Sequence, residues 1–143
     1  MESGLNFEVI WSDQDMIEVV FRCSNGHFSG RAEIYLSHRA FSELACVLRG
    51  FPSTGTDSRE VELGTFNSSH ADGGVKMKFR CSDALGHAVV ELKLRGDGSE
   101  ALGELESVAL RIPIEPAAVD SFVQQLMAMD STIGASASLP MVT

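Results

Sequence analysis

Apolar and polar residues alternate along most of the chain as far as residue 114, and a period of two predicts β-strands. The clearest case is residues 75–81, in which Lys76 and Lys78 separate hydrophobic residues. The pair Asn25-Gly26 predicts a tight hairpin turn, because both residue types tolerate positive φ. The segments with this pattern are residues 5–11, 16–23, 31–36, 59–66, 75–81, 88–95 and 106–114.

Two other segments have the period of a helix. The first lies between Ser37, a residue type that caps helices, and Gly50, and its apolar stripe consists of Phe41, Leu44, Ala45 and Leu48. The second begins at Pro116, since proline suits the first turn of a helix, and its stripe consists of Val119, Phe122, Val123, Leu126 and Met129.

These elements predict an α+β fold with three strands, a helix, four strands and a helix in chain order. Each strand has one apolar and one charged face, so we expect a single twisted antiparallel sheet of about seven strands with both helices packed on its apolar face. The basic residues expected on the outward, charged face are Lys76, Lys78, Arg80, Lys93, Arg95 and Arg111. We expect one domain over residues 1–130. Residues 131–143 are rich in Ser and Ala without periodicity, which predicts a flexible tail.

A short repeat divides the chain into two halves. The sequence Phe-Arg-Cys-Ser at residues 21–24 recurs at residues 79–82, and each copy is followed by a turn, a Gly-His pair and another strand. A structural repeat and a chance identity both account for this observation.

Composition and charge narrow the classes of partner. The chain has 143 residues, 44% of them hydrophobic, and a formal net charge of −9. Such a surplus of acid argues against nucleic acid and anionic membranes as partners and leaves a basic protein partner as a hypothesis. The acidic residues expected to contact such a partner are Asp57, Glu60, Glu62, Asp97, Glu100, Glu104 and Glu106.

One set of residues has the chemistry of a zinc site. Cys23, His27, Cys81 and His87 follow the two copies of the repeat, and two thiolates with two imidazoles would satisfy tetrahedral zinc. The spacings are not those of known zinc motifs, and both cysteines continue an apolar alternation, so buried apolar cysteines are the alternative. No catalytic motif and no cofactor motif is present, and we expect a non-enzymatic protein without a cofactor.

The N-terminal residues carry neither a basic start nor an apolar stretch of signal-peptide length. No segment approaches the ~20 apolar residues that span a bilayer. The cysteines lack a CxxC pattern, which suits free thiols in a reducing compartment. These observations predict a cytoplasmic protein.

The order of elements resembles the small bacterial WapI-like family over residues 5–129. The resemblance rests on a Phe-Ser-Gly segment at residues 28–30 that leads through Leu36 into a helix, and on a Gly-His-strand segment at residues 86–92 followed by a closing helix. That family includes immunity proteins of contact-dependent toxin systems. The resemblance implies a protein-binding module, with an immunity-type inhibitor of a toxin domain as its specific form.

Two other hypotheses stay open at this point. A small-ligand-binding or hydrolytic protein would use a pocket between sheet and helices, with polar side chains around a histidine. A homo-oligomer would pair the edges or the outer faces of its sheets.

Overall fold

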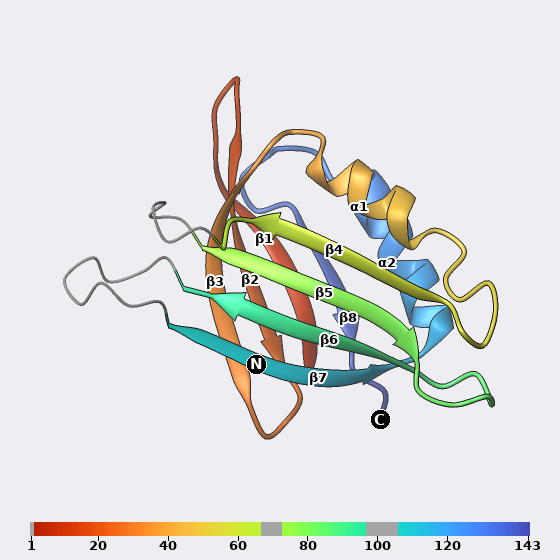
Figure 1. Ribbon diagram of the computed structural model, residues 1–143. Helices are drawn as coiled ribbons and strands as arrows, with labels where there is room; N and C mark the ends of the chain where they lie inside the picture. The colour runs from red at the N-terminus through yellow and green to blue at the C-terminus, as the bar shows by residue number, and fades with distance from the viewer. Residues whose placement is uncertain (1, 67–72, 97–105) are drawn as a thin grey trace.

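The strands predicted from alternation all form, but they are divided between two four-stranded antiparallel sheets. The computed structural model describes residues 2–66, 73–96 and 106–143 (Figure 1). The first sheet has the order β3-β2-β1-β8 and consists of β1 (Gly4–Ser12), β2 (Ile17–Ser24), β3 (Ser29–Leu36) and β8 (Ser136–Pro140). The second has the order β4-β5-β6-β7 and consists of β4 (Ser58–Gly64), β5 (Gly74–Cys81), β6 (Ala88–Arg95) and β7 (Ser107–Ile114).

The prediction of a single seven-stranded sheet is therefore wrong, although the α+β class is confirmed. The two sheets face each other, so each covers the apolar side of the other (Figure 1). They come closest along β3, where Gly30 has no side chain and a Cβ there would lie 2.8 Å from Val108 and 3.2 Å from Leu94 of the second sheet. The apolar face of each sheet is thus covered mainly by the other sheet, where we expected the helices to cover it.

The two helices fill the side where the sheets spread apart (Figure 1). They are α1 (Ala40–Leu48) and α2 (Pro116–Ala128), close to the predicted segments. Phe41 of α1 and Phe122 of α2 both contact Phe7 of β1, with ring centroids 5.6 and 6.3 Å apart. Ser37 does not cap α1, which begins without a side-chain cap; the Ser37 hydroxyl accepts a hydrogen bond from Arg39 N instead.

The predicted flexible tail is wrong for residues 136–140, which form β8 and pair with β1. Ala137 and Leu139 alternate with polar neighbours and are fully buried in the core. A strand of five residues has only two inward positions, so its alternation was too short to be recognised in the sequence. β8 thus completes the sheet that begins with β1.

Three sheet edges carry hydrogen bonds that occupy their outer backbone groups. At β8, Gln125 of α2 donates to the Ser138 carbonyl at 3.1 Å and accepts from the Ser138 amide at 2.9 Å. At β3, the Glu33 carbonyl accepts from the Gly73 amide at 3.1 Å, which joins the two sheets.

The β7 edge is occupied in the same way by two other segments. The Asn25 side chain donates to the Arg111 carbonyl at 3.0 Å, and the Val142 amide donates to the Pro113 carbonyl at 2.9 Å. Pro113 itself has no N–H to offer. These contacts occupy edge groups of β3, β7 and β8 that would otherwise be open to another strand, so they disfavour pairing at these three edges.

Within the described ranges, neither helix is long and apolar enough to cross a membrane.

Candidate functional site

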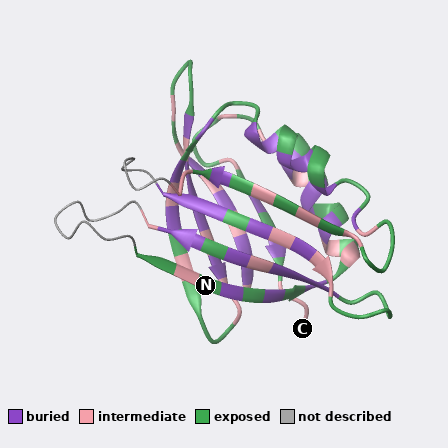
Figure 2. Ribbon diagram, viewed as in Figure 1, coloured by how far each residue is buried: buried purple, intermediate pink, exposed green. Residues whose placement is uncertain are grey.

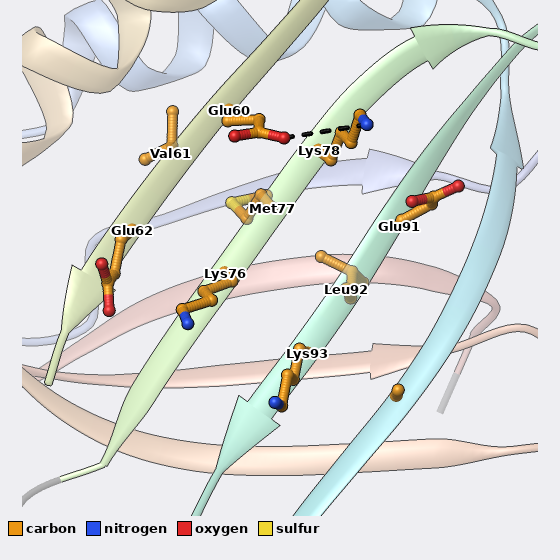
Figure 3. Close-up of a pocket in the computed structure, with 10 residues that line it drawn as sticks. Glu60, Val61, Glu62, Lys76, Met77, Lys78, Glu91, Leu92 and Lys93 are labelled. Carbon is orange, nitrogen blue, oxygen red and sulfur yellow. Dashed lines mark ion pairs between the residues drawn. The ribbon is translucent and has the colours of Figure 1, made fainter. Parts of the chain in front are cut away.

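A hollow of about 590 Å³ lies on the outer face of the second sheet (Figure 3). It faces away from the core, and Figure 2 shows that buried and exposed residues alternate along the strands beneath it. The hollow is lined from all four strands, by Glu60, Val61 and Glu62 of β4, Lys76, Met77 and Lys78 of β5, Glu91, Leu92 and Lys93 of β6, and Ala109 of β7.

The register of the sheet arranges the charged side chains in rows that run across the strands. One row contains Glu60, Lys78, Glu91 and Arg111, so acidic and basic residues alternate from strand to strand. Lys78 Nζ lies 3.7 Å from Glu60 Oε1. Opposite charges on facing positions stabilise a sheet modestly, so this row balances its own charge.

Glu91 is the acidic centre of this row. Arg80 of β5 donates from Nε to Glu91 Oε1 at 2.8 Å. This hydrogen bond, helped by the positive charges of Arg80, Lys78 and Arg111, lowers the pKa of Glu91 below its usual value. Glu91 is therefore an ionised carboxylate that Arg80 already engages.

The neighbouring row has a different balance. Glu62, Lys76, Lys93 and Ala109 face one another across the four strands, so two lysines lie directly opposite each other on β5 and β6. The two ammonium groups lie over the ring of Phe66, 4.4 Å from its centroid for Lys76 and 6.0 Å for Lys93.

Lys76 and Lys93, which we call the lysine pair, have no ion pair with any carboxylate that the structure describes. Both side chains are exposed. Like charges on facing positions destabilise a sheet, and Glu62, which faces Lys76 on its other side, forms no ion pair with it among the described residues. A local conflict of this kind is typical of a site that serves a ligand.

The zinc candidates are not brought together. Cys23 is fully buried in the first sheet, and burial raises the pKa of its thiol to about 11. Cys81 is in the second sheet, with Sγ 3.6 Å from the Thr54 carbonyl oxygen, and His27 is exposed at the β2–β3 turn. No three His, Cys, Asp or Glu residues are placed to hold a metal in residues 2–66, 73–96 and 106–143.

His87, the fourth zinc candidate, is bonded elsewhere. Its Nδ1 lies 2.5 Å from Asp83 Oδ2 within the β5–β6 turn. The Asp83 carboxylate also accepts from the amides of Leu85 and His87, and these bonds lower the pKa of Asp83. The pair shapes an exposed turn, which accounts for both residues.

The acidic candidates for a basic partner are placed in different surroundings. Asp57 is bonded to Arg59 beside the end of α1, whereas Glu60 and Glu62 line the hollow together with lysines. Glu106 is exposed where β7 begins, and its carbonyl accepts from the Gly96 amide. Asp97, Glu100 and Glu104 lie outside the described residues.

The remaining histidines and the interior bear on the hypothesis of an internal pocket. His38 is exposed, and His70 lies outside the described residues. The space between the sheets and the helices is filled by buried apolar side chains that form one cluster. The hollow lies on the outside of the second sheet, away from the space between sheet and helices that this hypothesis requires.

The alternation predicted that the lysines and Arg111 face outward, and the outward face is confirmed. Arg95, expected on the same face, is buried, with 1% of its surface exposed, and donates to the Thr65 carbonyl. Sequence reasoning missed Ala109, which lines the hollow, and Phe66, whose ring lies beneath Lys76 and Lys93. Both roles depend on which strands pair and in which register.

Comparisons with protein-family models, curated proteins and solved structures found no match to this chain.

Proposed function

We propose that this protein is a non-catalytic binding module that recognises a partner protein with the outer face of β4–β7. The observation that carries the proposal is the hollow on that face, lined by charged side chains from neighbouring strands. A rigid sheet holds these side chains in a fixed pattern, and such preorganisation reduces the entropy lost on binding.

The covered edges support the choice of a face over an edge. The outer backbone groups of Ser138, Glu33 and Arg111 are already bonded within the chain. A partner strand at β3, β7 or β8 would have to displace these bonds, whereas the outer face of the second sheet is open.

An immunity-type inhibitor is the specific form of the proposal, and its support is the resemblance to the WapI-like family. In that form the protein would occupy a toxin domain and prevent its action. The acidic residues Glu60 and Glu62, considered for a basic toxin, share the hollow with lysines. Basic side chains outnumber acidic ones on the described strands of this face, so we take the partner's contact surface to be acidic.

The test uses Ala109, an exposed residue at the rim of the hollow. A photo-crosslinking amino acid at position 109 is introduced in the native host, with position 136 of the first sheet as the matched control. We expect position 109 alone to crosslink one protein. That protein, purified, should bind the wild-type chain and bind Ala109→Trp much more weakly, because the indole fills the hollow, whereas Ser136→Trp should bind normally.

Two results would overturn the proposal. The first is the same set of crosslinked proteins from positions 109 and 136. The second is equal affinity of the purified partner for wild type and Ala109→Trp, with circular dichroism showing that the variant is folded.

A further inference from the structure

We propose that the lysine pair, Lys76 and Lys93, anchors neighbouring carboxylates of an acidic segment of the partner protein. This inference rests on the proposed function and names the chemistry of its partner. The register brings the two lysines face to face on β5 and β6, beside the open space that Ala109 leaves on β7.

The cations of this face are not equivalent. Lys78 is paired with Glu60, and Arg80 with Glu91. The lysine pair lies over the ring of Phe66, which orients the ammonium groups without neutralising them. Glu62 faces Lys76 from β4, but no ion pair joins the two among the described residues. An incoming anion would therefore meet positive charge that has no carboxylate partner among the described residues.

Phe66 also fixes where the ammonium groups lie. Its ring packs against Gly74, where an added Cβ would lie 2.7 Å from the ring. The glycine thus allows the ring to rest on the sheet, and both lysine side chains extend over the same ring. Two ammonium groups directed to one aromatic platform favour a ligand with two closely spaced negative charges.

The surrounding carboxylates favour a peptide over a nucleic acid. Glu60, Glu62 and Glu91 line the same hollow, and they would repel the continuous charge of a phosphate backbone. A protein segment can instead place acidic residues at the lysine pair and neutral or basic residues beside the glutamates. The mixed lining thus selects for a pattern of charge.

The first experiment titrates the ¹⁵N-labelled protein with a short synthetic peptide that contains two glutamates separated by one glycine. We expect saturable shifts of the Lys76, Lys93 and Ala109 amides, and none with the glutamine version of the peptide. The double variant Lys76→Gln/Lys93→Gln should weaken binding about tenfold, the effect of losing two surface ion pairs. Arg31→Gln, on the other sheet, is the control with normal binding.

Three results would overturn the inference. One is the absence of shifts with the glutamate peptide. Another is an unchanged affinity of the double variant, whose thermal unfolding shows it to be folded. The last is the same saturable shifts with acetate or inorganic phosphate at equal concentration, which would indicate a general anion site.

The partner identified by crosslinking separates this inference from the proposed function. If Ala109→Trp blocks the partner and the double lysine variant binds it normally in low salt, the binding face stands and the anchor is wrong. If Ala109→Trp has no effect, the proposed function itself fails. If Ala109→Trp and the double lysine variant both bind the partner more weakly, and high salt lowers the affinity of the wild type alone, the results support both the binding face and the lysine anchor.

Discussion

The guanidinium of Arg59 is held by the carboxylate of Asp57 through two hydrogen bonds, 3.3 Å from Nε to Oδ1 and 2.8 Å from Nη2 to Oδ2. The remaining guanidinium nitrogen, Nη1, does not contact Asp57 but donates to the carbonyls of Val47 and Arg49 at the end of α1. Carbonyls at a helix end lack partners within the helix, and a cation there is favourable. Asp57 therefore positions the group that ends α1, which is a structural role and differs from the partner contact that we expected.

We predict that Asp57→Asn lowers the free energy of unfolding at neutral pH by about 1–2 kcal/mol. The bonds to Arg59 and Ser53 lower the pKa of Asp57 from 3.8 to about 2. A pKa lowered by folding stabilises the protein above about pH 4, and this contribution is lost as the pH falls from about 4 toward 2. Urea unfolding at several pH values measures it.

The exposed Asp120→Asn on α2 is the control for this prediction. Its acid unfolding should follow that of the wild type. Equal stability of Asp57→Asn and wild type at pH 7 would show that the clamp contributes nothing.

Gln125 protects the edge strand β8, and we predict that Gln125→Ala exposes it. The two hydrogen bonds to Ser138 satisfy both backbone groups of that residue. Without them, hydrogen exchange of the Ser138 amide should accelerate, and the variant should lose about 1 kcal/mol of stability. Gln124→Ala, the neighbouring exposed position, is the control. Unchanged exchange at Ser138 would contradict the protective role.

Because the two sheets approach each other closely, the glycines differ in whether they can be replaced by alanine. A Cβ on Gly73 would lie 2.7 Å from the Arg95 carbonyl oxygen and 2.8 Å from that of Glu33, both of them backbone atoms. A Cβ on Gly30 meets only side chains. We predict that Gly73→Ala costs about 3 kcal/mol and Gly30→Ala less, since side chains can move. Gly55→Ala, with open space around it, should be neutral in thermal unfolding.

His38 connects three segments through both ring nitrogens. Nε2 lies 2.7 Å from the Asp13 carbonyl oxygen, and Nδ1 lies 2.6 Å from Ser131 Oγ. Because a carbonyl can only accept, the neutral ring carries its proton on Nε2 and accepts from the Ser131 hydroxyl. We predict that ¹⁵N NMR of the neutral form shows an unprotonated Nδ1. The opposite tautomer would contradict this reading of the contact.

Much of the fold could be predicted from the sequence, because alternation shows which side of each strand is buried. It does not show which strands pair. A sheet of seven strands would be ~34 Å wide, whereas two packed helices cover only ~20 Å. Helices as short as α1 and α2, of 9 and 13 residues, leave apolar surface that only a second sheet can cover. A single sheet of this width would therefore leave part of its apolar face uncovered.

Less of the candidate site could be predicted from the sequence, because the site depends on which strands pair and in which register. Alternation placed Lys76 and Lys93 on the outer face, but their opposition is a property of register. Conversely, Asp57 looked like a free acidic loop residue, although Arg59 two positions later is its partner. Charge counted along a chain does not distinguish a carboxylate that is already paired from one that is open to a ligand.

The pairing of β1 with β8 has a consequence for synthesis on the ribosome. Leu5 pairs with Leu139, so the first sheet stays incomplete until residue 139 has been made. The second sheet is contiguous from Ser58–Gly64 to Ser107–Ile114 and needs no later strand. Until β8 arrives, the nascent chain carries β1 with an open edge, and contacts of such long range form slowly. The outer face of the second sheet, with its hollow, can thus be assembled before the first sheet that packs behind it is finished.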